Sequence, residues 1–193
     1  MNNLLINCHL FIINISNGNA RLILKKGNNK LSIPKIVYEG KDSIDFNIKK
    51  FLKSDINISC FNINSCHVYS KNNIIDIIFV AFTRDDKLND GYNYYILNEL
   101  DQKLISKDVI NYLKDNMRKM VFIKQLYNEY FSLRELKDLY ENIYHIELDR
   151  RNFRKRLLNF KIITETEDVR KKDRNGRPNK LYKFNEPFDI NLI

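Results

Sequence analysis

The sequence contains few of the residues that build the commonest catalytic sites. It has three cysteines, and none lies in a Cys-x-x-Cys pair of the kind that binds zinc. It has five glycines, and they form neither a glycine-rich phosphate loop nor a nucleophile elbow. Its apolar runs fall short of the ~18 residues that predict a membrane-spanning helix. These absences argue against zinc-ribbon, P-loop, α/β-hydrolase and membrane proteins.

The cysteines and histidines do not predict a metal site either. Cys8-His9 and Cys66-His67 are adjacent pairs in stretches that read as β-strands, where successive side chains point to opposite faces. We therefore expect Cys8, Cys60 and Cys66 to be reduced thiols, and we expect no metal and no cofactor. Three cysteines without paired spacing fit a reducing cytoplasm, where we place the protein.

Positive charge is concentrated near the C-terminus. The whole chain carries 33 Lys and Arg against 24 Asp and Glu, a formal net charge of +9. Residues 147–184 alone hold 13 basic and six acidic residues. A cationic field of this size attracts a polyanion and releases its counterions. Charge alone does not distinguish a surface that binds a polyanion from a basic surface that is simply solvated.

Two short helices are predicted in this region. Ser132 and Glu135 have the spacing of a capping box, which begins a helix. The apolar face of this first helix consists of Leu133, Leu136, Leu139, Tyr140 and Ile143. After a turn at residues 145–148, Asp149 is a favourable N-cap for the second helix.

The second helix has the features of a DNA-recognition helix. Phe153, Leu157 and Phe160 have the spacing i, i+4, i+7, so we expect them to face inward. The residues expected to point away are Arg151, Asn152 and Lys155, flanked by Arg150 and Arg154. Arginine and asparagine make bidentate contacts with guanine and adenine edges. Five basic residues among the seven from Arg150 to Arg156 favour DNA contact over an ordinary charged surface.

A β-hairpin is predicted after the second helix. Residues 162–166 and 181–184 read as strands, and Asn175-Gly176 is a strong turn signal between them. The basic residues expected at the tip are Lys171, Lys172, Arg174 and Arg177. Two helices and a basic hairpin predict a winged helix-turn-helix, whose second helix enters the DNA major groove. Such a module reads few base pairs alone, so we expect a homodimer on a palindromic operator.

Three segments resemble the winged helix domain of the Nudix-related, NrtR-like bacterial regulators. They are residues 131–141 (FSLRELKDLYE), 149–158 (DRRNFRKRLL) and 176–184 (GRPNKLYKF). The resemblance implies an N-terminal Nudix-like domain, a sequence-specific DNA-binding transcriptional regulator that acts as a repressor, and an effector such as ADP-ribose or another nucleotide or sugar metabolite.

The N-terminal half is compatible with a Nudix α/β sandwich. Four strand-like runs, at residues 4–15, 20–25, 59–69 and 74–82, surround a predicted helix at 44–52. The apolar start, Met1–Ile15, has no basic residues, so it predicts a strand and not a signal peptide. The expected fold class is α+β, with a Nudix-like α/β sandwich followed by a C-terminal winged helix-turn-helix.

An ungapped alignment of residues 34–44 and 50–58 with the loop and catalytic helix of the Nudix family predicts that the active site has been lost. Lys35 and Ile36 stand where the family has glycines, while Phe51 and Ser54 replace carboxylates and only Asp55 keeps an acid. Nudix hydrolysis needs several carboxylates to hold Mg²⁺ against a diphosphate, so we expect no enzyme. The alternative for this segment is an ordinary helix packed on a sheet, which is not the remnant of a ligand site. For the chain, the alternatives are a Nudix-type hydrolase of nucleoside diphosphate derivatives with a divergent metal site, and a structural DNA-binding protein without an effector.

The predicted domain boundary lies within residues 85–105, which begin with the polar, turn-rich segment Asp85–Gly91. We expect a degenerate Nudix-like domain at residues 1–92, for dimerisation or ligand sensing, a linker at 93–105 and a winged helix domain at 106–193. Ser106 can cap a helix that bridges the halves, and its apolar stripe would be Val109, Leu113, Met117 and Met120.

Overall fold

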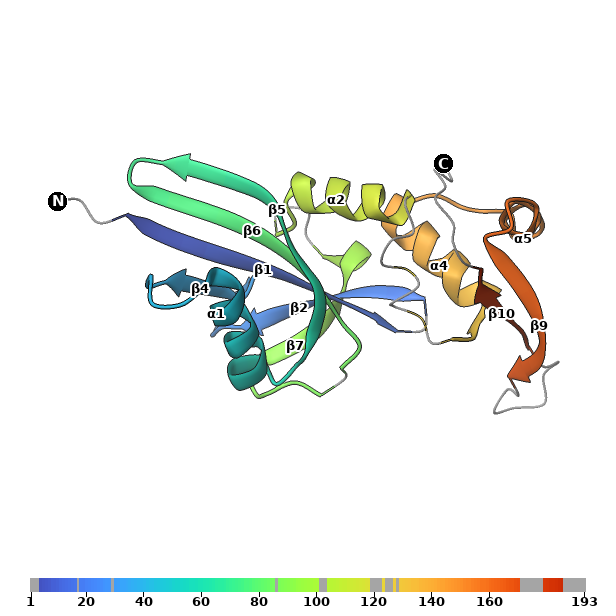
Figure 1. Cartoon of the computed structure of the whole chain (residues 1–193), viewed down its shortest axis with the longest axis horizontal. Coiled ribbons are helices and arrows are strands. Elements are labelled where there is room, and N and C mark those ends of the chain that lie inside the picture. The colour runs from blue at the N-terminus through green and yellow to red at the C-terminus, as the bar shows by residue number, and fades with distance from the viewer. Residues whose placement is uncertain are drawn as a thin grey trace. The chain divides into compact units, whose positions relative to one another are not determined.

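The structure is a computed structural model that describes residues 4–16, 18–28, 30–85, 87–100, 104–118, 123, 127, 129–170 and 179–185. The chain divides into two compact units. The first comprises Met1–Ser16 and Ala20–Tyr112, and the second comprises Asn17–Asn19 and Leu113–Ile193. Figure 1 labels most of the helices and strands of both. Within the described ranges, no helix is long and apolar enough to cross a membrane.

A seven-stranded mixed sheet forms the frame of the first unit. Its strands are β1 (Leu5–Ser16), β2 (Asn19–Lys26), β3 (Leu31–Ser32), β4 (Lys35–Tyr38), β5 (Cys60–Lys71), β6 (Ile74–Thr83) and β7 (Tyr92–Ile96). The main path runs β3-β2-β1-β6-β5, with β4 paired to β1 and β7 paired to β2. β1 and β6 are parallel, and the pairs β1–β4, β2–β3, β2–β7 and β5–β6 are antiparallel. The four predicted strands are confirmed, with small shifts at their ends.

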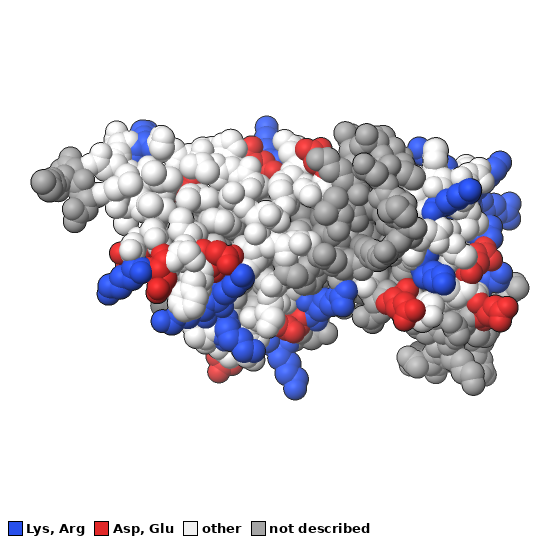
Figure 2. Space-filling view, in the orientation of Figure 1, with Lys and Arg blue, Asp and Glu red and all other residues white. Residues whose placement is uncertain are grey.

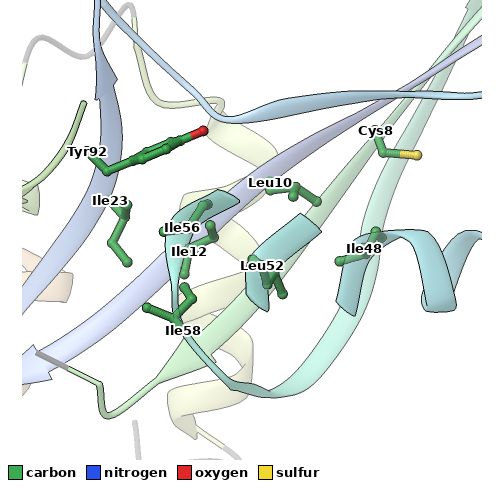
Figure 3. Packing of buried hydrophobic residues seen from close by; sticks show 9 residues of the cluster. All are labelled: Cys8, Leu10, Ile12, Ile23, Ile48, Leu52, Ile56, Ile58 and Tyr92. Atoms are coloured by element: carbon green, nitrogen blue, oxygen red, sulfur yellow. The ribbon is translucent and has the colours of Figure 1, made fainter. Parts of the chain in front are cut away.

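Helix α1 (Ile44–Phe51) and the π-helical turn η1 (Leu52–Ile56) cover one face of this sheet. The Ser43 hydroxyl begins the helix by accepting a hydrogen bond from the Phe46 amide at 3.2 Å. The buried core between helix and sheet is shown in Figure 3 and consists of Cys8, Leu10, Ile12, Ile23, Ile48, Leu52, Ile56, Ile58 and Tyr92. The helical members recur at every fourth position and the β1 members at every second, so both periodicities face the same core. The predicted helix at 44–52 is confirmed.

The predicted linker at 93–105 is wrong at its start. Residues 92–96 form β7, which pairs with β2 from Arg21↔Ile96 to Lys25↔Tyr92. The turn-rich segment before Tyr92 is therefore a loop within the sheet and does not separate two domains. The prediction failed because the pairing of β7 with β2 joins residues some 70 positions apart, which no local signal records.

Helix α2 (Lys107–Arg118) begins at Ser106, whose hydroxyl accepts a hydrogen bond from the Asp108 amide at 3.2 Å. The predicted stripe is confirmed for Val109, Leu113 and Met117, which are fully buried, while Met120 lies outside the described residues. The division into units falls within this helix, between Tyr112 and Leu113.

Between Glu129 and Asn185, the described residues of the second unit form two helices and a small antiparallel sheet. Its elements are β8 (Phe131–Ser132), α4 (Leu133–Tyr144), α5 (Arg150–Asn159), β9 (Ile163–Arg170) and β10 (Asn179–Phe184). The strand order is β8-β10-β9. The predicted capping box is confirmed: the Ser132 hydroxyl accepts from the Glu135 amide, and the Glu135 carboxylate accepts from the Ser132 amide. All five residues predicted for the apolar face of this helix are buried.

Candidate nucleic-acid interface

The turn between α4 and α5 is held by backbone geometry and by one carboxylate. His145 ends α4 in the left-handed conformation, with φ at 55°. The Glu141 carboxylate accepts a hydrogen bond from the Leu148 amide at 2.7 Å. Burial works to raise the pKa of Glu141, but this hydrogen bond and Lys137 outweigh it, and the pKa is lowered overall. The charged carboxylate therefore fixes the chain that leads into α5.

Helix α5 begins and packs as the sequence predicts. The Asp149 carboxylate accepts a hydrogen bond from the Asn152 amide at 2.8 Å, as an N-cap does. Leu157 is fully buried, and Phe153 packs edge-on against Tyr140 of α4 with ring centroids 5.5 Å apart. This packing orients α5 so that the opposite side of the helix is exposed.

The prediction for Phe160 is wrong. Its side chain is 52% exposed, although the i+7 spacing from Phe153 placed it inward. Helix α5 ends at Asn159, and Phe160 itself has φ −80° and ψ 5°, outside helical geometry. Phe160 is therefore the C-cap of α5, and the chain turns away directly after it, at Lys161 with a positive φ of 54°, so the spacing extended the apolar face one residue beyond the helix.

The α5 residues predicted to contact DNA are exposed. Four of them, Arg150, Arg151, Asn152 and Lys155, present their side chains on the surface of the helix. Figure 2 shows Lys and Arg side chains gathered over α5, with carboxylates beside them. These residues span the N-terminal turns of the helix, the part of a recognition helix that reaches base edges. The arrangement offers guanidinium, ammonium and amide groups to a DNA groove.

The fifth, Arg154, is engaged within the protein. Its Nη2 donates to Glu165 of β9, and its Nε donates to the Tyr182 hydroxyl of β10 at 3.1 Å. Lys180 also contacts Glu165, with Nζ 2.9 Å from Oε2. Sequence reasoning missed Glu165, Tyr182 and Lys180, because their meeting depends on the register of β9 and β10.

The other predicted DNA contacts were expected at the tip of the β-hairpin. Lys171, Lys172, Arg174 and Arg177 fall outside the described residues. The strands that lead to them are described, and they pair from Phe184↔Ile163 to Asn179↔Arg170. The predicted β-hairpin is therefore confirmed at its base.

The residues aligned with the Nudix motif lie in strand β4 and in the helical segment that includes η1. Lys35 and Ile36 lie in β4, opposite His9 and Cys8 of β1. The Ser54 hydroxyl donates to Asp55 Oδ2 at 2.6 Å, and both residues are exposed. Among the described residues, no group of three or more His, Cys, Asp or Glu side chains is arranged to hold a metal ion.

The cysteines are free thiols, one of them buried and two of them partly buried. All three are free, and Cys8 is fully buried. Burial raises the pKa of Cys60 to about 12, with Asp85 adding to the effect, and burial and Asp108 raise the pKa of Cys66 to about 11. His9 lies on the other face of β1 from Cys8 and pairs with Asp76 at 2.8 Å. A raised thiol pKa disfavours both metal ligation and nucleophilic attack at neutral pH.

Comparison with known proteins supplies the family of the second unit. Residues 123–184 match the NrtR DNA-binding winged helix domain. Most of the second unit is thus similar to an NrtR winged helix domain. No curated protein matches the chain.

Solved structures show that the likeness in fold extends over 93% of the chain. The chain is similar to Shewanella oneidensis NrtR complexed with a 27mer DNA, with 13% identity, a TM-score of 0.66 and coverage of 93% of each chain. It is also similar to a MutT/nudix family protein from Enterococcus faecalis, with 14% identity, a TM-score of 0.65, and coverage of 93% of this chain and 87% of the other. At these identities the likeness establishes the fold. The NrtR-like chain thus has a Nudix-like unit and a winged helix unit, as the resemblance implied.

Proposed function

We propose that this NrtR-like chain is a transcriptional repressor that binds duplex DNA in the cytoplasm. The observation that carries the proposal is the exposed basic surface of α5, formed by Arg150, Arg151, Asn152 and Lys155, on a domain matched to a DNA-binding winged helix. In this function α5 enters the major groove. Arg151 and Asn152 contact base edges, and Lys155 and the basic wing residues contact phosphates. Repression results if the bound operator overlaps a promoter.

The first test separates base contacts from phosphate contacts. Asn152→Ala is expected to relax base preference at one operator position, at a cost of about 1–3 kcal/mol. Lys172→Ala in the wing is expected to weaken binding to all sequences and to lessen the salt dependence. Fluorescence anisotropy on a duplex selected from a randomised library, and on its scrambled counterpart, measures both effects.

The matched control for the base-contact test is Asn159→Ala, an exposed asparagine at the other end of the same helix. This variant should keep the wild-type base preference. If wild type and Asn152→Ala discriminate equally between selected and scrambled duplexes, the assignment of base contact to Asn152 is wrong.

We further propose that the repressor is a homodimer joined through its Nudix-like sheet. Leu5 and Ile74 are cross-strand partners at one end of the sheet, and both are about two-fifths exposed. Val37 of β4 lies opposite Asn7 of β1, and its side chain is 50% exposed. Exposed apolar residues on neighbouring strands of one sheet favour a protein–protein contact. A second copy is the occupant that a palindromic operator requires.

Light scattering of the pure protein at micromolar concentration is expected to give about twice the chain mass of 23.2 kDa. Ile74→Lys should shift the mass toward the monomer, because a buried interface does not accept an unpaired charge. Val68→Lys, which places the same charge at an exposed apolar position on the opposite face of the sheet, is the control. A single-chain mass for the wild type, with one protomer per operator, would reject the dimer.

The Nudix-like unit is proposed to sense a metabolite and not to hydrolyse it. The resemblance to NrtR-like regulators supports a nucleotide or sugar effector such as ADP-ribose, and the replacement of two family carboxylates by Phe51 and Ser54 supports the loss of catalysis. A thermal-shift screen with ADP-ribose, NAD and sugar phosphates separates a sensor from a DNA-binding protein without an effector.

We predict no release of AMP or phosphate from ADP-ribose or other nucleoside diphosphate derivatives with Mg²⁺ or Mn²⁺. A metal ion bound by Asp55 alone would keep most of its waters and would not be fixed against a diphosphate. The assay uses purified protein with Asp55→Ala as the control. Turnover near ~1 s⁻¹ that this substitution abolishes would favour the alternative, a hydrolase with a divergent metal site.

A further inference from the structure

One carboxylate of the second unit holds a cation from the recognition helix and a cation from the wing. Glu165 of β9 accepts from Arg154 of α5 through Oε1, and from Lys180 of β10 through Oε2. Arg154 is fixed a second time, because its Nε donates to the Tyr182 hydroxyl. The backbone of Tyr182 is anchored in turn, since β10 is the central strand of the sheet and Tyr182 pairs with both Phe131 and Glu165.

This cluster lies where the wing changes register. Tyr182 pairs with Glu165, whereas Lys180, only two residues earlier on β10, pairs with Val169. Strand β9 therefore contains extra residues in this stretch, which is a β-bulge. The Thr166 hydroxyl donates to the Leu181 carbonyl at 3.0 Å inside it. A bulge bends its strand and changes the direction of the residues beyond it, and the end of β9 leads into the basic wing.

The exposure of the three side chains indicates that the cluster fixes their positions more than it stabilises the fold. The side chains of Glu165, Arg154 and Lys180 are 26%, 44% and 65% exposed. Ion pairs this exposed contribute about 0–1 kcal/mol to folding. Their geometry is nevertheless specific, because the guanidinium presents two of its N–H groups to two fixed acceptors. A cation held in this way is also withheld from indiscriminate contact with phosphate.

We infer that Glu165 is a specificity-determining positioning residue of the DNA interface. It fixes the base of the wing to α5, and it prevents Arg154 and Lys180 from adding sequence-independent affinity. Arg154 is accordingly a positioning residue and not a base-reading one. The inference rests on the proposed function, in which α5 and the wing bind DNA together.

The test compares Glu165→Gln with Glu167→Gln. Both substitutions remove one negative charge from β9, and Glu167 is exposed and two residues further along the strand. The probes are a duplex selected from a randomised library by the wild type and its scrambled counterpart, titrated at several salt concentrations. Glu165→Gln is expected to bind the scrambled duplex more tightly, with a salt slope steeper by about one to two. Its ratio of selected to scrambled affinity should fall roughly tenfold, while Glu167→Gln keeps the wild-type ratio.

Arg154→Met breaks the same contact from the helix side. This variant should lower the ratio of selected to scrambled affinity. It should not steepen the salt dependence of binding, because it removes a cation from α5 and frees no other cation of that helix to contact DNA. The double variant Arg154→Met/Glu165→Gln should have about the same ratio as either single variant. Equal behaviour of Glu165→Gln and Glu167→Gln, or full additivity in the double variant, would overturn the inference. Absence of DNA binding by the wild type would instead reject the proposed function from which it starts.

Discussion

Arg151→Glu/Lys155→Glu is expected to weaken binding to the selected duplex by about 100-fold or more. Each residue is exposed on α5, and loss of one base or phosphate contact costs about 1–3 kcal/mol. Charge reversal adds repulsion from the DNA backbone to the two lost contacts. Because both side chains point away from the core, the far-ultraviolet circular dichroism spectrum and the unfolding temperature should stay close to those of the wild type. Fluorescence anisotropy measures the affinity.

The control for charge alone is Lys50→Glu/Lys53→Glu. These lysines are exposed in and just after helix α1 of the Nudix-like unit, and the net charge changes by the same amount. This variant should lose only the small, salt-sensitive part of the affinity that comes from overall charge. Equal losses in the two double variants would show that a general cationic field, and not α5, accounts for DNA binding.

Leu136→Ala is expected to destabilise the winged helix unit by about 2–5 kcal/mol, because it empties a fully buried site. Leu136 lies in the first half of α4, on the buried face of that helix. A loss of this size is a large share of the stability of a small domain, so the variant should also lose DNA binding near its lowered unfolding temperature. Urea denaturation followed by circular dichroism measures the change.

Arg134→Ala on the same helix is the matched control for the core substitution. Its side chain is 73% exposed and makes an i, i+4 ion pair with Asp138 at 3.4 Å. Its removal should cost no more than about 0.5 kcal/mol. A loss near that value for Leu136→Ala as well would contradict the packing described for α4.

The sequence predicted the elements of the winged helix because their signals are local. The capping box of Ser132 and Glu135 and the N-cap of Asp149 each join atoms three residues apart. The apolar stripe of α4 and the alternation in β1 result from the fixed periods of helix and strand. The resemblance to NrtR-like regulators was carried by these same segments, and the domain match at residues 123–184 confirmed it.

The Nudix-like unit was predicted less completely. Its four long strands and α1 were correct, but β7 was taken for a linker and the short strands β3 and β4 were not anticipated. Short strands carry too few alternating residues to stand out from a loop. Their place in the sheet depends on partners elsewhere in the chain, as when β7 pairs alongside β2.

By itself the sequence determined that this protein has a capped helix pair, the second helix of which is basic, a hairpin and a strand-rich N-terminal half with few of the Nudix carboxylates. Only the tertiary structure decided which of the basic residues on α5 pair with other side chains of the protein. Arg154 and Arg151 have the same chemistry and lie in the same run, yet Arg154 is engaged by Glu165 and Tyr182, 11 and 28 positions away. The physical reason is that helix and strand periods are local, whereas strand register and side-chain pairing depend on how distant segments meet.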